Sequence, residues 1–212
     1  MKKDAMILIA CEESGTVTEA FVNLGFTNVY SCDLLPTSGN YPERHLQCDA
    51  LELLKIKWDM IIAHPPCTYM SKAGACRMYP KAGEIDQDRF YKAMKAKEFF
   101  MQFYNCDCNK IAIENPTPLK CVKLPKPSQV IQPYEYGEQY SKRTLLWLKG
   151  LKPLKPTKIL QEYKPFMPSN TGGFSRGKGG ARGVVHDAKA ASKTFPGIAR
   201  AMAEQWGGIC DG

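Results

Sequence analysis

The sequence predicts an α/β fold built on a mainly parallel sheet, with helices covering both faces. Two observations support this prediction. Short apolar runs without polar alternation, such as residues 6–10 and 58–63, recur along the chain, as expected for strands that are buried on both faces. Segments with helical spacing of apolar residues separate these runs, which favours parallel strands joined by crossover helices.

The first third of the chain contains repeated strand–helix units. After the first apolar run, Val17, Phe21 and Leu24 recur at the spacing of one helix face, and Gly25 is suited to end that helix. The other elements expected in this part are strands at 28–33, 45–49 and 58–63, and a helical turn at 50–54.

The rest of the core follows the same logic. A helix is expected at 86–104, where Phe90, Met94 and Phe103 recur at helical spacing, and Pro196 is suited to the first turn of a closing helix. The remaining expected elements are strands at 110–116, 128–137 and 143–150, the last two forming a closing antiparallel pair.

The composition divides the chain into three parts. Residues 151–190 are rich in Pro, Gly and basic residues and have no core pattern, so we predict an irregular basic segment. Residues 1–150 then form the core, and residues 191–212 form a helix that packs back on it.

The overall composition is that of a globular protein in a reducing compartment. Of 212 residues, 44% are hydrophobic and 24% are charged, and nine cysteines lack framework spacing. No apolar run approaches the length of a membrane span. We therefore expect a cytoplasmic protein with no membrane partner, as a monomer or alternatively a dimer. The net charge of +8 is concentrated in residues 149–200, which favours a polyanionic partner.

Polar residues follow the ends of the five predicted parallel strands. Ligands of such sheets bind outside the carboxyl ends of the strands, so we expect a site at this edge. The residues are Glu12, Asp33, Asp49, Cys67 and Glu114.

The turn after the first strand, residues 11–16, has only one glycine and two acids, and is a poor phosphate cradle. Its acids suit a ligand with amines or hydroxyls, or alternatively cap the following helix. Asp33 is suited to bind a ribose and Asp49 an adenine amine. The implied ligand is a nucleoside without pyrophosphate, such as S-adenosylmethionine.

Cys67 lies in the stretch IIAHPPCTYMS, where two prolines impose a rigid turn after a strand. It could be a small loop residue, a metal ligand or a nucleophile with a lowered pKa. The C-x-C spacing of Cys106 and Cys108 is unlike a zinc site, so we expect no metal.

Three motifs resemble DNA cytosine-5 methyltransferases. HPPCTYMS resembles their Pro-Cys motif, IENP (113–116) their Glu-Asn motif, and EQYSKRTLLWL (138–148) their Gln-x-Arg-x-Arg motif. The segments ILIACEESG, SCD, QCDAL and KTFPGIARAMAEQW stand in the order of their cofactor-binding and closing motifs. The resemblance covers residues 6–150 and 190–207 and is strongest to short phage-encoded members.

The sequence departs from that family at several positions. Glu13 and Thr16 stand where the family has glycines, Ser141 replaces the first arginine of the Arg pair, and Ile198 stands where the closing motif has an asparagine. The segment in the place of a target-recognition domain, residues 151–190, is short.

The resemblance implies a three-layer Rossmann-like fold of the class I S-adenosylmethionine-dependent methyltransferases, acting on cytosine carbon-5 in DNA inside a bacterial host cell. It implies that the Cys67 thiolate attacks the base, that Glu114 with a raised pKa holds ring nitrogen 3, that Arg143 holds the base carbonyl or Glu114, and that Asn115 braces the loop of Cys67. The cofactor residues expected are Glu12, Glu13, Ser14, Gly15, Thr16, Asp33, Leu34, Asp49, Ala50, Pro65 and Gly197. His64 would face the base, contact DNA or cap the strand, and the sequence leaves these three interpretations open.

Other functions compete with this one. The substrate could be a free pyrimidine nucleotide, because the recognition segment is small, although the basic segment 149–200 favours DNA. A non-catalytic DNA-binding protein on a degenerate methyltransferase scaffold is a further alternative. Methylation of an exocyclic amine fits poorly, because such enzymes have an acid or Asn before Pro-Pro and an aromatic residue after it, whereas this chain has His64 and Cys67 there.

Overall fold

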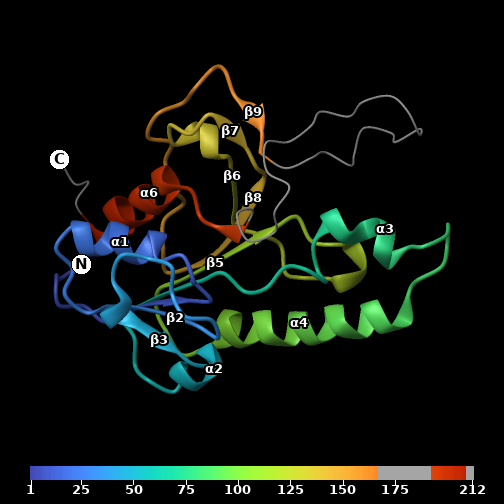
Figure 1. Cartoon of the computed structure of the whole chain (residues 1–212), viewed down its shortest axis with the longest axis horizontal. Coiled ribbons are helices and arrows are strands. Elements are labelled where there is room, and N and C mark those ends of the chain that lie inside the picture. Colours follow the sequence, from blue (N-terminus) through green and yellow to red (C-terminus); the bar gives the residue numbers. More distant parts are fainter. Residues whose placement is uncertain (167–191, 209–212) are drawn as a thin grey trace.

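The computed structural model describes residues 1–166 and 192–208, and a seven-stranded sheet forms its centre (Figure 1). The strands stand in the order β3-β2-β1-β4-β5-β8-β6. They are β1 (Ile7–Ala10), β2 (Val29–Asp33), β3 (His45–Gln47), β4 (Met60–Ala63), β5 (Ile111–Pro116), β6 (Gln129–Ile131) and β8 (Thr144–Lys149).

The sheet is parallel from β3 to β5, and β8 runs antiparallel to both β5 and β6. The predicted mainly parallel sheet with an antiparallel closing pair is therefore confirmed. The strand order reverses at β1, which has β2 on one side and β4 on the other. Such a switch point opens a crevice at the carboxyl ends of the strands.

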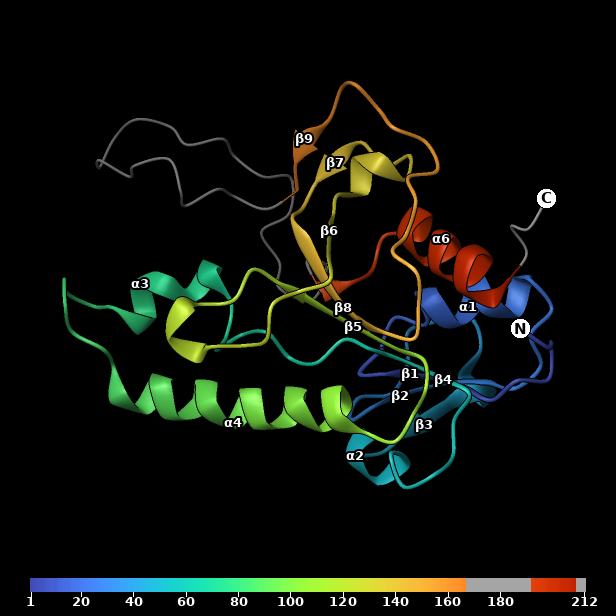
Figure 2. The same ribbon diagram turned by 180° about the vertical axis from the view of Figure 1, so that it is seen from behind.

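Helices cover both faces of the sheet (Figures 1 and 2). Ile7 and Ile9 of β1 face the core that includes α1 (Thr16–Asn23) and α6 (Pro196–Gly207). Leu8 faces the opposite core, which includes residues of α2 (Ala50–Leu53) and α4 (Gln87–Asn105). Because alternate side chains of a strand point to opposite faces, the strands are apolar throughout. The three-layer Rossmann-like fold is confirmed.

Local chemistry explains where the helices begin. Gly15 precedes α1 with a φ of 67°, a left-handed conformation that glycine adopts without strain. The Asp86 side chain accepts a 2.8 Å hydrogen bond from the backbone N–H of Arg89 and so caps α4. Pro196 occupies the first turn of α6, as predicted. No helix within residues 1–166 and 192–208 is long and apolar enough to cross a membrane.

One expectation for the closing region was wrong. The strand expected at 128–137 ends at Ile131, because Pro133 lacks an N–H for a ladder and begins a 3-10 turn instead. Leu154 is buried in the core although the segment after residue 150 shows no core pattern. The part of that segment at 167–190 lies outside the described residues. The remaining short elements are η1 (Pro42–Arg44), η2 (Lys72–Gly74), α3 (Ala75–Met78), η3 (Lys120–Val122), η4 (Pro133–Glu135), β7 (Tyr140–Ser141) and β9 (Lys164–Pro165).

Candidate active site

Three segments meet at one end of the sheet, at the carboxyl ends of β4 and β5. The turn from His64 to Cys67 leaves β4, and Glu114 and Asn115 lie in β5, the neighbouring strand. Because β8 is antiparallel to β5, with Pro116 opposite Thr144, the residues that precede β8 arrive at the same end. The topology therefore brings the three motif segments together.

The Cys67 turn is held by backbone and side-chain hydrogen bonds. The Cys67 carbonyl accepts bonds from the N–H groups of Met70 (3.0 Å) and Ser71 (2.9 Å). The Asn115 amide, 1% exposed, donates a 2.9 Å bond to the carbonyl of Pro65. Asn115 therefore ties this turn to β5, and it leaves Cys67 half-buried.

Cys67 is a protonated thiol in the free protein. Burial raises its pKa, and the negative charge of Glu114 raises it further, while the positive charge of Lys142 lowers it. The pKa of this thiol is therefore not lowered, as the nucleophile alternative would require, because desolvation and a neighbouring carboxylate outweigh the one cation.

Glu114 shows the opposite shift. Burial of its carboxyl would raise its pKa, but a hydrogen bond from His64 and the positive charges of Lys142 and His64 outweigh burial, and the pKa is lowered. The expected raised pKa of Glu114 was wrong, because the sequence motif does not show that the side chains of His64 and Lys142 face this carboxyl. Glu114 is therefore a carboxylate at neutral pH.

His64 lies against Glu114. Its Nδ1 is 3.4 Å from Oε2 of Glu114, and the two side chains are 8% and 15% exposed. The other ring nitrogen, Nε2, is buried and has no hydrogen-bond partner among the residues that the structure describes. The structure thus gives His64 a carboxylate partner, which none of the three interpretations of the sequence included.

Lys142, which sequence reasoning missed, is the cation that faces this group. It lines a small pocket together with Glu114 and Thr144, and its charge acts on Cys67 and Glu114. Arg143 is exposed and does not line this pocket. Because Lys142 and Arg143 lie between β7 and β8 rather than in a strand, no side-chain alternation in the sequence could have told which of the two faces Glu114.

Glu12 caps helix α1. Its carboxylate, 4% exposed, accepts bonds from the backbone N–H groups of Val17 (2.5 Å) and Thr18 (3.2 Å) and from the Thr18 hydroxyl (2.7 Å). Burial raises the pKa of Glu12, against a lowering effect of His64 and of these bonds. Of the two roles considered for the acids of this turn, ligand binding and helix capping, the contacts of Glu12 are those of a helix cap.

The rest of the first turn packs on the loop after β2. The Glu13 carbonyl accepts a 2.7 Å bond from the Thr37 hydroxyl, and the Ser14 and Thr16 hydroxyls are 3.0 Å apart. A Cβ on Gly15 would lie 3.1 Å from the Cα of Gly39. The close approach of the two loops explains the single glycine of this turn.

The ends of β2 and β3 fit a nucleoside. Asp33 and Asp49 each accept a 2.9 Å turn bond through one carboxylate oxygen, from the N–H groups of Leu35 and Leu51. Leu34 is 70% exposed beside Asp33, and Ala50 is buried behind Asp49. Carboxylate oxygens and an exposed apolar side chain at these strand ends are the groups that a ribose, an amine and an adenine ring require, so the chemistry of these residues is compatible with S-adenosylmethionine.

Gly197 has a packing role. Its N–H donates a 2.9 Å bond to Glu138, and a Cβ there would lie 2.1 Å from the Tyr136 carbonyl oxygen. The glycine thus allows α6 to approach the chain before β7. Gly197 contacts Tyr136 and Glu138 in this segment. The other expected cofactor residues Asp33 and Asp49 follow β2 and β3, so these contacts do not link Gly197 to them.

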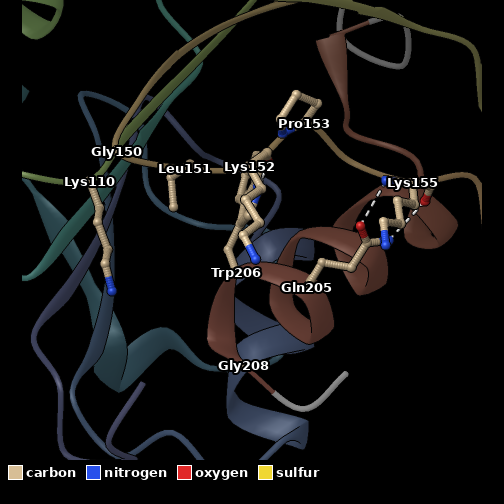
Figure 3. A pocket seen from close by; sticks show the side chains of 9 residues that line it. All are labelled: Lys110, Gly150, Leu151, Lys152, Pro153, Lys155, Gln205, Trp206 and Gly208. Atoms are coloured by element: carbon tan, nitrogen blue, oxygen red, sulfur yellow. Dashed lines mark hydrogen bonds between the residues drawn. The ribbon is translucent and has the colours of Figure 1, made fainter. Parts of the chain in front are cut away.

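A larger cavity, of about 430 Å³, lies at the opposite ends of the strands (Figure 3). Lys110 precedes β5 and Gly150 follows β8, so the cavity is at the far ends of the strands that carry the site. Its lining residues are Lys110, Gly150, Leu151, Lys152, Pro153, Lys155, Gln205, Trp206 and Gly208.

No protein-family model and no curated protein matches this sequence. The solved structures that resemble it include an E. coli prophage protein described as a DNA modification methyltransferase, with 15% identity and a TM-score of 0.47 over 77% of this chain and 53% of that one. They also include a methyltransferase of Entamoeba histolytica, with 12% identity and a TM-score of 0.44 over 77% of this chain and 58% of that one. This chain thus matches little more than half the length of either protein.

Proposed function

We propose that this protein transfers a methyl group from S-adenosylmethionine to carbon-5 of cytosine in DNA, through a covalent bond to Cys67. The observation that supports this best is the placement of Cys67 and Glu114 on neighbouring strand ends, close enough for the charge of Glu114 to raise the pKa of the thiol. A nucleophile beside a carboxylate suits attack on a pyrimidine ring.

The two pKa shifts suggest how the thiol is activated. Sγ of Cys67 bonds to carbon-6 of the base as its S–H bond breaks, and the Glu114 carboxylate takes the proton. The protonated Glu114 then donates to ring nitrogen 3, where negative charge develops. Carbon-5 becomes nucleophilic, and S-adenosylmethionine supplies the methyl group. Loss of the carbon-5 proton to a base or water lets the thiolate leave.

Lys142 and Asn115 complete the arrangement. The charge of Lys142 acts to lower the pKa of Cys67 and of Glu114 and so favours both anions. We assign to Lys142 the base carbonyl, the role that the resemblance assigned to Arg143. The bond from Asn115 to Pro65 fixes the turn that carries the thiol.

Exposed lysines support DNA as the substrate. Phosphate contacts from lysine provide sequence-independent affinity, and the target base has to leave the helical stack before Cys67 can reach it. The described part of the basic segment 149–200 includes the exposed residues Lys158 and Lys164, and also Lys149, Lys152 and Lys155 at the ends of the strands far from Cys67.

Product identification tests the proposal. The protein is incubated with methyl-labelled S-adenosylmethionine and either duplex DNA or free cytidine nucleotides, and the digested products are separated. Label in 5-methylcytosine from DNA supports the proposal. Label in free nucleotides alone indicates the nucleotide alternative, and absence of both label and cofactor binding by calorimetry indicates a non-catalytic scaffold.

A further inference from the structure

His64 is a buried ring near two carboxylates. Its side chain is 8% exposed, its Nδ1 is 3.4 Å from Oε2 of Glu114, and it lies near enough to Glu12 for its charge to lower the pKa of that group too. A carboxylate can only accept a hydrogen bond, so Nδ1 carries the proton in this contact.

The backbone of His64 is fixed on both sides. Its N–H donates a 2.9 Å bond to the carbonyl of Ala10 in β1. The next residue, Pro65, accepts the bond from Asn115 of β5. The backbone that carries the His64 ring is therefore hydrogen-bonded to both neighbouring strands, β1 and β5. These bonds fix the position of His64 relative to β5.

Only one of the two carboxylates near His64 is free to respond to it. Glu12 already accepts three hydrogen bonds, from Val17 and Thr18 at the start of α1. The side-chain hydrogen bond recorded for Glu114 in the described chain is the one from His64. The charged groups that face Glu114 are His64 after β4, Lys142 before β8 and, across the small pocket, Lys193 before α6.

The second ring nitrogen supports a role in binding rather than in packing alone. Nε2 of His64 is buried without a partner in residues 1–166 and 192–208, and an unpaired buried polar atom destabilises the fold. An apolar side chain at this position would fill the same space without that destabilisation.

We propose that His64 is a positioning residue, which holds the Glu114 carboxylate toward Cys67 as the acceptor of the thiol proton. The inference rests on the proposed function for its catalytic consequence. As Sγ bonds to carbon-6, the S–H proton passes to Glu114 while His64 keeps its own proton on Nδ1.

The first test is independent of methyl transfer. The carboxyl of Glu114 is titrated by ¹³C NMR in the wild type and in His64→Gln and His64→Asn, and Glu114→Gln identifies its signal. We expect the pKa of Glu114 to rise in both His64 variants. The matched control is His45→Gln, because His45 pairs with Ser31 and Leu35 at β3; it should leave Glu114 unchanged. An unchanged pKa of Glu114 in folded His64 variants overturns the proposal.

The second test measures the pH dependence of turnover. In His64→Gln we expect kcat on DNA to fall on the order of 10-fold to 100-fold, with KM for DNA and cofactor nearly unchanged. The acid limb of the kcat profile should move to higher pH, because fewer Glu114 carboxyls are ionised. A fall in kcat without movement of that limb indicates a structural role and contradicts the proposal. If the wild type does not methylate DNA, the proposed function fails, and the NMR titration still decides the role of His64.

Discussion

Asn115 donates a 2.9 Å hydrogen bond to the carbonyl of Pro65, so the strand that carries Glu114 also fixes the turn that carries Cys67. Asn115 and Pro65 are both buried. The hydrogen bond between them therefore lies in a low-dielectric environment, where it is strong and its loss destabilises the fold. The spacing between thiol and carboxylate thus depends on one side chain.

Asn115→Ala should therefore damage both stability and turnover. Removing the donor leaves the Pro65 carbonyl buried without it, at a cost of about 1–3 kcal/mol, and lets the Cys67 turn shift. Urea denaturation and kcat measure the two effects. Asn105→Ala, at the exposed end of α4, is the control. Unchanged kcat in Asn115→Ala would argue against the bracing role.

Cys67→Ser should abolish methyl transfer and leave S-adenosylmethionine binding nearly intact, because the serine hydroxyl is a far weaker nucleophile and the cofactor residues expected at β1, β2 and β3 are unchanged. Cys76→Ser is the matched control, since Cys76 is an exposed cysteine. Methylation assays and calorimetry give the two readouts. Retained transfer in Cys67→Ser would rule out the covalent mechanism.

Glu114→Gln should speed alkylation of Cys67. The negative charge of Glu114 is one cause of the raised pKa of this thiol, so its removal increases the thiolate fraction at a given pH. Pulsed iodoacetamide labelling with peptide mass spectrometry measures the rate, and Cys76 serves as the internal control. A slower or equal rate at Cys67 would mean that the two groups do not interact.

Glu114 should also give the protein an acid-sensitive contribution to stability. Its pKa is lowered in the folded state, so the stabilisation is present above the unfolded pKa and is lost as the pH falls through the folded value. Unfolding free energies measured from neutral to acid pH should show this loss in the wild type and a smaller one in Glu114→Gln. Equal losses in both would contradict the lowered pKa.

Lys142→Met should reduce kcat by about 100-fold, as loss of a charge that stabilises the transition state does. Arg143→Met should have a much smaller effect, because Arg143 is exposed. Steady-state kinetics on DNA decide between the two. A larger loss in Arg143→Met would show that the motif resemblance, rather than the pocket, identifies the working cation.

The strands and long helices could be predicted because their signals are local. Continuous apolar runs such as residues 6–10 and 58–63 report burial on both faces, and Pro196 marks a helix start by its fixed φ. The burial of Leu154 could not be predicted, because a single apolar residue among prolines gives no periodicity.

The protonation states of the site were beyond the sequence for a different reason. The pKa of Glu114 depends on His64 and Lys142, which lie 50 and 28 positions away in the chain. Motif matching could name Cys67 and Glu114, but it could not show which cations face them. The motif also pointed to Arg143, whereas the neighbouring residue Lys142 lines the pocket.

The most direct test of the central claim is to trap the bond to Cys67. The protein is incubated with S-adenosylmethionine and duplex DNA in which 5-fluorocytosine replaces cytosine, so that the carbon-5 proton needed for release is absent. We predict a complex stable in denaturant, with a peptide cross-linked at Cys67 and no complex in Cys67→Ser. Methylation of ordinary DNA without any such adduct at Cys67 would contradict the account.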